Sequence, residues 1–190
     1  MNKIIARLNK RANNLTEERK KFIQECEESG KFNKYQMEEI KDGFKNRLTM
    51  EQIKFYADPK FDWQQMWAIR AGFQDGLTMD QVKLYADTKF NGGQMKEILL
   101  GFENGLTMEQ IKFYIDPKFS AGQMNQISSG FRNGLSMEQV KLYADPKFRD
   151  FEMQEIRYRL ENEWTIEEIK NKYKLASKNN KLNRIARKLK

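Results

Sequence analysis

The chain has 190 residues, of which 39% are hydrophobic and 33% charged, and its formal net charge is +8. It contains 13 Phe, 7 Tyr and 3 Trp, which is too rich in aromatic residues for an intrinsically disordered chain. Histidine is absent, the single cysteine excludes an internal disulfide, and no apolar run reaches the roughly 20 residues that a membrane span needs.

Charge is unevenly distributed along the chain. Residues 1–14 carry four basic residues and no acid, and residues 171–190 carry eight basic residues and no acid, which leaves −4 for residues 15–170. The first residues lack an uninterrupted apolar run, so we expect no secretory signal. A free cysteine is typical of a reducing compartment, and we expect a cytoplasmic protein.

The first expected element is a basic N-terminal helix followed by a capping helix, both within residues 1–31. A helix beginning at Leu15-Thr16 resembles the second helix of the repeats that follow, with about one extra turn. Because the outer face of a terminal repeat has no neighbour, repeat proteins need such capping elements.

A 29-residue repeat then dominates the chain. The segment LTMEQIKFYADPKF at 48–61 returns as LTMDQVKLYADTKF at 77–90, LTMEQIKFYIDPKF at 106–119 and LSMEQVKLYADPKF at 135–148. Self-similarity at such a period predicts a repeat architecture in which no single repeat folds alone. Five repeats span 32–60, 61–89, 90–118, 119–147 and, less regularly, 148–176.

The first half of each repeat predicts a helix with a capping box. In the second repeat, Asp62 is the expected N-cap and Gln65 can reach back to its amide, with a hydrophobic staple alongside. Met66, Ile69 and Phe73 have the i, i+3, i+7 spacing of a buried helix face. Asn-Gly pairs supply the left-handed residue that closes the helix in the third and fourth repeats.

The second half predicts another capped helix, from Thr78 with Gln81 in the second repeat. Val82, Tyr85 and Ala86 are expected to face inward. We expect this helix to end at the Asp-Pro pairs 116–117 and 145–146, because the residue before proline avoids the α region.

One glycine recurs inside each first helix, where it costs about 1 kcal/mol against alanine. Its recurrence at 29 residues suggests a close approach between helices, and Arg159 replaces it in the fifth repeat. The glycines are Gly43, Gly72, Gly101 and Gly130.

These patterns predict an all-α fold, a right-handed α-solenoid of tandem two-helix repeats with terminal capping helices. Residues 177–190 are expected to form a basic C-terminal helix or tail. The segment YADPKFDWQQMWAIRAGF resembles short helical-pair repeats of uncharacterised phage, plasmid and integrated-element proteins of Gram-positive bacteria. The resemblance covers residues 32–170, implies a mobile-element origin, and brings no catalytic residue with it.

The composition argues against an enzyme. Without histidine, one cysteine has no partner for nucleophilic catalysis and cannot build a zinc site. Carboxylates such as Glu51 and Glu109 fall in first helical turns, where the helix dipole is a sufficient reason for them. We therefore expect a non-enzymatic protein with no cofactor and no bound metal.

Binding is the favoured function, and the variable first helices are the expected binding surface. Positions 3, 7, 10 and 14 of each repeat differ strongly, and their spacing predicts that they share one helix face. Trp and Arg on such a face are common hot-spot residues. The alternative is that both tryptophans pack under a neighbouring repeat or the N-terminal helix. The candidate partner-binding residues are Trp63, Trp67, Arg70, Lys96, Leu99, Asn125 and Arg132.

Nucleic-acid binding is the alternative function. One lysine recurs in each second helix, and a ladder of this kind can follow a phosphate backbone, although ordinary solvated lysines would show the same pattern. The C-terminal run sets basic residues beside an apolar stripe. The candidate residues are Lys54, Lys83, Lys112, Lys141, Lys181, Arg184, Arg187 and Lys188.

The expected function is therefore recognition of another macromolecule, either a protein or a ribonucleoprotein, in the cytoplasm of a host bacterium. With the mobile-element resemblance, this becomes an inhibitor of a host nucleic-acid-targeting defence complex. The alternative is a nucleic-acid-binding accessory protein that uses its basic termini and the lysine ladder.

Overall fold

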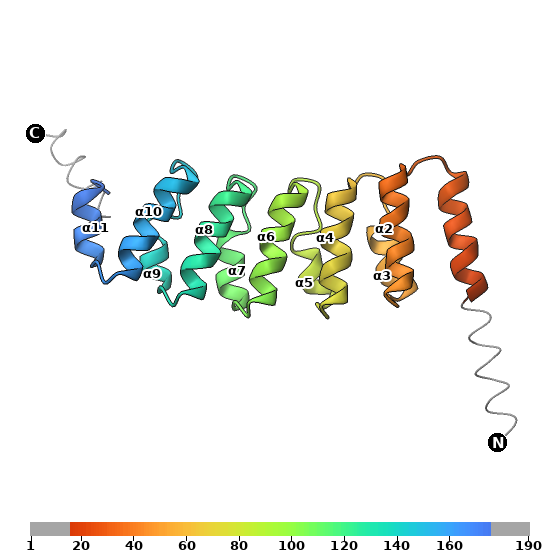
Figure 1. The fold of residues 1–190 in the computed structure, drawn as a ribbon, viewed down its shortest axis with the longest axis horizontal. Coiled ribbons are helices and arrows are strands. Elements are labelled where there is room, and N and C mark those ends of the chain that lie inside the picture. Colours follow the sequence, from red (N-terminus) through yellow and green to blue (C-terminus); the bar gives the residue numbers. More distant parts are fainter. Residues whose placement is uncertain (1–15, 176–190) are drawn as a thin grey trace, which may run out of the picture. The chain divides into compact units, whose positions relative to one another are not determined.

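The computed structural model describes residues 16–175, and every regular element within that range is a helix (Figure 1). The chain divides into two compact units, Met1–Leu99 and Leu100–Lys190. None of the helices in residues 16–175 is long and apolar enough to cross a membrane. The expected all-α class is therefore confirmed for the described part of the chain.

Unit 1 contains a helix at 16–28 and the helical pairs of the first two repeats. Helices α2 and α4 are successive first helices and pack against each other, while α3 packs against both (Figure 1). The elements are α2 (Lys34–Lys45), α3 (Met50–Tyr56), α4 (Trp63–Gln74), α5 (Met79–Lys83) and α6 (Gly92–Glu103), of which residues 92–99 belong to unit 1.

Unit 2 has the same order of packing. Helices α8 and α10 are successive first helices in contact, α7 and α9 pack against α8, and α11 packs against α10. Contact between successive first helices, α2 with α4 and α8 with α10, suggests helical repeats, in agreement with the 29-residue period. The elements are α7 (Met108–Tyr114), α8 (Ala121–Arg132), α9 (Met137–Val140), α10 (Asp150–Glu161) and α11 (Ile166–Lys172).

The predicted capping boxes are confirmed in both halves of the repeat. The backbone N–H of Gln65 donates to Asp62 Oδ1, and the N–H of Asp62 donates to Gln65 Oε1, each at 2.8 Å. Thr78 and Gln81 make the same reciprocal pair in the second helix. These contacts satisfy amides that the first turn of a helix leaves without partners.

The predicted core is also confirmed in the second repeat. Met66, Ile69, Val82 and Tyr85 are fully buried, and Phe73 is 4% exposed. The first helices close with a residue in the left-handed region. It is glycine in three repeats, with φ between 72° and 86°.

The second helices are shorter than their sequence predicts. Helix α7 ends at Tyr114 and α9 at Val140, before the Asp-Pro pairs that were expected to stop them. After α9 the chain forms a turn at Asp145, whose Oδ1 accepts from the backbone N–H of Lys147 at 3.0 Å. Asparagine and aspartate side chains commonly organise turns by bonding the backbone two residues onward.

The recurring helix glycine makes room for a tyrosine side chain. A Cβ at Gly72 would lie 2.0 Å from Tyr85 Oη, and this hydroxyl donates to the carbonyl of Ala68 at 3.2 Å. The close neighbour is thus the tyrosine of the same repeat and not another helix backbone. Gly43, Gly101 and Gly130 face Tyr56, Tyr114 and Tyr143 in the same way.

The fifth repeat departs from this arrangement in a coordinated way. Arg159 occupies the glycine position, and its Nε donates to Tyr173 Oη at 3.0 Å. Lys172 stands where the other repeats have the buried tyrosine. Loss of the glycine therefore accompanies loss of the side chain that required it.

Candidate recognition surface

An exposed aromatic cluster lies on the first helices of unit 1. Trp63 is the first residue of α4 and is 43% exposed, and Trp67 follows one helical turn later and is half-buried. Tyr35 of α2 is 58% exposed, with its ring centroid 6.0 Å from that of Trp63. Exposed aromatic groups on neighbouring helices are typical of interaction surfaces.

Beside the two tryptophans lies a hollow of ≈ 220 Å³, which we call the tryptophan groove. It is lined by Trp63, Gln64, Trp67, Gly92, Gly93 and Lys96. A Cβ at Gly92 would lie 2.4 Å from the Cβ of Gln64, so α6 begins too close to α4 for any other residue. Gly93 is exposed and leaves the space that a side chain would fill.

The groove presents hydrogen-bond donors that no described residue uses. Within residues 16–175, the indole N–H groups of Trp63 and Trp67 and the ammonium of Lys96 have no hydrogen-bond or ion-pair partner. Both indoles donate only, and an ammonium also has no acceptor. The surface can therefore bind a ligand that offers apolar groups together with acceptors.

The tenth position of the repeat faces the interior, which corrects the expected binding face. Arg70 is 8% exposed and Leu99 1% exposed. Arg70 Nε lies 2.7 Å from Glu39 Oε2, and its guanidinium also donates to Gln74. Because both side chains are buried, neither Arg70 nor Leu99 is available to a partner.

Burial of this ion pair is costly unless both charges are satisfied. Desolvation raises the pKa of Glu39, and the hydrogen bond and charge of Arg70 oppose that shift. Removing either partner would leave one uncompensated charge in the interior. The pair therefore ties the first repeat to the second.

Position 8 of one repeat and position 10 of the next carry a different pair of residues at each junction between repeats. Thirty-one residues separate Glu39 from Arg70, and the equivalent positions at the next junction are Ala68 and Leu99, both buried. An ion pair in one place thus corresponds to an apolar pair in the next. Part of the variation among first helices therefore follows from contacts between repeats.

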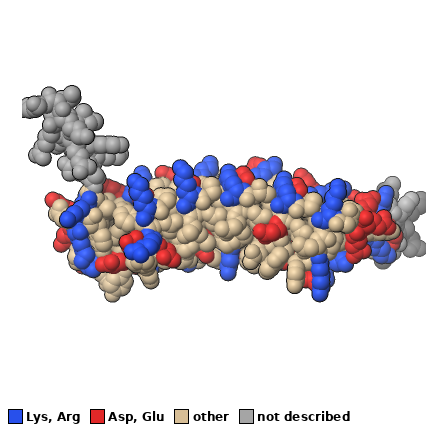
Figure 2. All heavy atoms as spheres, turned by 90° about the horizontal axis from the view of Figure 1, so that it is seen from above, with Lys and Arg blue, Asp and Glu red and all other residues tan. Residues whose placement is uncertain are grey.

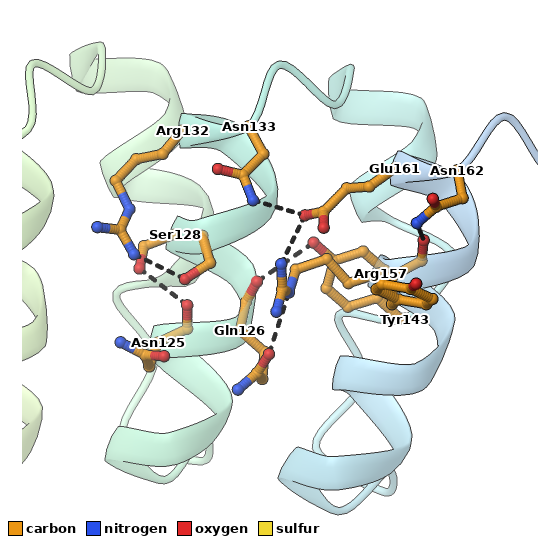
Figure 3. A network of polar contacts seen from close by, with 11 residues as sticks. Asn125, Gln126, Ser128, Arg132, Asn133, Tyr143, Arg157, Glu161 and Asn162 are labelled. Atoms are coloured by element: carbon orange, nitrogen blue, oxygen red, sulfur yellow. Dashed lines mark hydrogen bonds and ion pairs between the residues drawn. The ribbon is translucent and has the colours of Figure 1, made fainter.

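In unit 2 the equivalent junction is a polar network, drawn in Figure 3. Arg157 Nε donates to Gln126 Oε1 at 3.1 Å, and its Nη1 lies 2.6 Å from Glu161 Oε1. Asn133 Nδ2 donates to the same Glu161 oxygen at 2.9 Å. The network joins α8 to α10, and the side chain of Arg157 is 15% exposed.

The two remaining partner-binding candidates lie on α8 and are not part of the tryptophan groove. Asn125 is half-buried, and its backbone carbonyl accepts from Ser128 Oγ at 3.1 Å (Figure 3). Arg132 is exposed and donates to Ser129 Oγ at 2.7 Å. The structure thus brings Trp63, Trp67 and Lys96 together and leaves these two apart from that lining.

The candidate lysine ladder is exposed in both units. Lys54 and Lys83 in unit 1, and Lys112 and Lys141 in unit 2, are all solvent-accessible. Figure 2 shows the basic side chains scattered among acidic side chains and uncharged surface. Lys181, Arg184, Arg187 and Lys188 lie outside the described residues.

The charge balance of the described residues differs from that of the whole chain. All 27 acidic residues but only 25 of the 35 basic residues lie within 16–175, which gives a net charge of −2 there. A second recurring lysine is also neutralised locally in unit 1, since Lys60 and Lys89 lie 2.9 and 3.0 Å from Asp58 and Asp87. The basic excess belongs to residues 1–15 and 176–190.

Cys26, the one cysteine of the chain, is buried. Burial raises the pKa of the Cys26 thiol, with Glu25 and Glu27 acting in the same direction, so the nucleophilic thiolate is disfavoured at neutral pH. Residues 16–175 contain no group of three His, Cys, Asp or Glu side chains placed to hold a metal ion.

Sequence reasoning missed Tyr35 and the structural importance of Gly92 and Gly93. Two consecutive glycines, which occur in the third repeat and in no other, were the available signal for a hollow. Comparison with protein families, with curated proteins and with solved structures gives no match to this chain.

Proposed function

We propose that this chain is a non-enzymatic repeat protein that binds another macromolecule, a protein or a ribonucleoprotein, through the tryptophan groove and Tyr35. The single observation that carries this proposal is the exposure of Trp63 beside a hollow whose donors have no partner among the described residues. Large aromatic side chains at the centre of a contact contribute most of the binding energy in many interfaces.

The proposed architecture is a right-handed α-solenoid in which the five repeats follow one another. The recurring inward positions of both halves of the repeat supply the core contacts, and the variable outer positions supply specificity, as in other repeat proteins. The basic segments 1–14 and 171–190 would add long-range attraction to an acidic partner or to nucleic acid.

The resemblance to repeats of Gram-positive mobile elements gives this proposal a concrete form. The protein would act in the bacterial cytoplasm as an inhibitor of a host nucleic-acid-targeting defence complex. It would do so by occupying a protein surface and not by chemistry.

Affinity capture from a Gram-positive bacterial lysate tests the proposal. Wild-type chain should retain a partner after nuclease treatment, and the double substitution Trp63→Ala/Trp67→Ala should abolish that retention. Tyr158→Ala is the matched control, because Tyr158 is 63% exposed on unit 2 and outside the groove. Undiminished capture by the tryptophan variant would contradict the proposal.

Nucleic-acid binding is the second candidate, favoured by the exposed lysines of both units. It predicts affinity that falls steeply between about 50 and 200 mM salt, because phosphate contacts release counterions. Deleting residues 177–190 should then remove binding. Retention that is insensitive to salt and nuclease would reject this candidate.

A further inference from the structure

The lining of the tryptophan groove favours a ligand that has hydrogen-bond acceptors and few hydrogen-bond donors. Its lining side chains include two indoles and one ammonium, all of which donate only, and Gln64 is the one lining side chain that also accepts. A ligand rich in N–H donors would leave those donors poorly paired on binding. A ligand with carbonyl oxygens, few N–H groups and apolar faces would suit this lining.

We propose that the groove binds an extended proline-rich segment of the partner in the polyproline II conformation. This inference rests on the proposed function and specifies the partner for the same site. Proline has no backbone N–H, and a polyproline II helix makes no internal hydrogen bonds, so its carbonyls remain free to accept. Aromatic-lined grooves are a recurrent way of binding such segments.

The spacing of the aromatic rings supports this proposal. The ring centroids of Tyr35 and Trp63 are 6.0 Å apart. Trp63 and Trp67 are four residues apart on α4, which is about 6 Å along a helix axis. Two residues of a polyproline II helix also advance about 6 Å. Two prolines separated by one residue lie on two of the three edges of a polyproline II helix, so a segment aligned with α4 can contact Trp63 and Trp67. Tyr35 lies on the neighbouring helix α2, beside this line.

The glycine pair provides room for a pyrrolidine ring beside the indoles. Gly92 allows the start of α6 to approach Gln64, and Gly93 leaves the hollow of ≈ 220 Å³ open. A rigid polyproline segment also loses little conformational entropy when it binds.

Single-stranded nucleic acid fits this groove less well. Non-specific binding of a single strand combines stacked bases with a positively charged path for the phosphates. Lys96 is the only cation in the lining of the groove, and unit 1 has no excess of basic residues in its described part. Aromatic stacking alone would leave the phosphates without partners.

The indole N–H signals in a nitrogen–proton correlation spectrum provide a local test. The chain has three tryptophans, and Trp164 lies in unit 2 with the Arg159 guanidinium 4.6 Å from its ring centroid. Titration with an end-blocked decaproline peptide should shift the signals of Trp63 and Trp67 in a saturable way. The signal of Trp164 should stay in place.

Two further probes separate the possible ligands. A glycine–serine peptide of the same length and a thymidine decanucleotide should leave all three indole signals unchanged. The proposal is overturned if decaproline produces no saturable shift, if Trp164 responds as strongly as the groove tryptophans, or if the oligonucleotide binds more tightly than decaproline.

A substitution that fills the groove tests whether decaproline binds there, and it removes no aromatic residue. Gly93→Gln introduces the side chain that Gln64 already presents at the equivalent position, and it should weaken decaproline binding by about tenfold or more. Gly122→Gln is the matched control in unit 2, where the nearest atom is the carboxylate of the exposed Asp150. Equal affinity of both variants for decaproline would refute the assignment.

The capture experiment and the decaproline titration fail in different ways. If Trp63→Ala/Trp67→Ala loses its partner but decaproline does not bind, the proposed function stands and the polyproline inference falls. If that variant retains its partner, the groove is not the recognition site and both fall.

Discussion

Two sets of variable positions on the first helices of unit 1 have opposite environments. Positions 3 and 7 of the second repeat, Trp63 and Trp67, border an open groove, whereas position 10, Arg70, is buried against Glu39 of the preceding repeat. In the sequence alone, both sets of positions vary from repeat to repeat, and nothing distinguishes one set from the other. Variation within a repeat family therefore has two sources, recognition of a partner and the fit between neighbouring repeats.

The inner pairs show how the fit between repeats can change without changing the fold. The junction between the first two repeats has Glu39 and Arg70, and the next has Ala68 and Leu99. Mismatched pairs would bury a lone charge or leave a void. We expect these positions to favour one order of repeats over alternative pairings.

The largest expected effect comes from breaking the buried ion pair. Arg70→Ala leaves Glu39 charged and unpaired in the interior, and should lower the free energy of unfolding by about 3–5 kcal/mol. Urea denaturation followed by circular dichroism measures this loss. The double substitution Glu39→Ala/Arg70→Leu copies the next junction and should recover most of the stability. If the double variant is as unstable as Arg70→Ala, the junction pairs are not interchangeable modules.

A smaller loss is expected at the helix glycine that faces Tyr85. Gly72→Ala should destabilise by about 1–3 kcal/mol through overpacking, although helix propensity alone would favour alanine by about 1 kcal/mol. The sign of the change in urea midpoint therefore separates the two effects. In a Tyr85→Phe background the same substitution should cost less, because the obstructing hydroxyl is gone. A stabilising Gly72→Ala would show that the tyrosine moves freely.

The next prediction compares the loss of stability at Gln65 and at Gln81, the two capping glutamines of the second repeat. Gln65 caps α4 and also donates from Nε2 to the carbonyl of Phe90 at 2.6 Å, a buried contact 25 residues away. Gln65→Ala should cost about 1–3 kcal/mol, because a buried carbonyl loses its donor. Gln81→Ala removes the capping contact of α5 and should cost about 1 kcal/mol or less. Equal losses in thermal denaturation would argue against a role for Gln65 between repeats.

The smallest effect on stability is expected at the outer position. Trp63→Ala should lower the free energy of unfolding by about 1 kcal/mol or less, because the side chain is still 43% exposed in the folded protein. The same urea experiment gives the comparison with Arg70→Ala directly. A loss comparable to that of Arg70→Ala would place Trp63 in the packing of the fold and would erase the distinction between the two sets of positions.

Much of the local structure was predictable because it depends on short-range chemistry. The Asp62–Gln65 box and the buried stripe of Met66, Ile69 and Phe73 are encoded within one helix. Helix propensity, capping and periodicity all act over fewer than ten residues, and here they agree. The 29-residue period then extended each local prediction to the other repeats.

The contacts between repeats were not predictable from the same patterns. Arg70 is polar and occupies a variable position, so the sequence favoured a solvent-exposed interpretation, yet Glu39 lies 31 residues earlier and compensates its burial. The second bond of Gln65 is hidden for the same reason, since capping already explained that side chain. A contact between side chains from neighbouring repeats leaves no periodic signal inside either repeat.

The groove itself was only partly predictable. Trp63 and Trp67 stood out by residue type, but the hollow depends on how closely α6 begins to α4 at Gly92. That distance is a property of packing between repeats. Leu99 was assigned to the binding face although the structure buries it, because a first helix has one face toward its own repeat and another toward its neighbour.

The most direct test of the account is partner capture by the Gly93→Gln variant, measured at a temperature where it and the wild type are equally folded. We expect unchanged thermal stability together with loss of the captured partner, because Gly93 is exposed and the substitution fills the tryptophan groove without altering the buried junction pairs. Capture equal to that of the wild type would contradict the claim that this groove is where the protein recognises its partner.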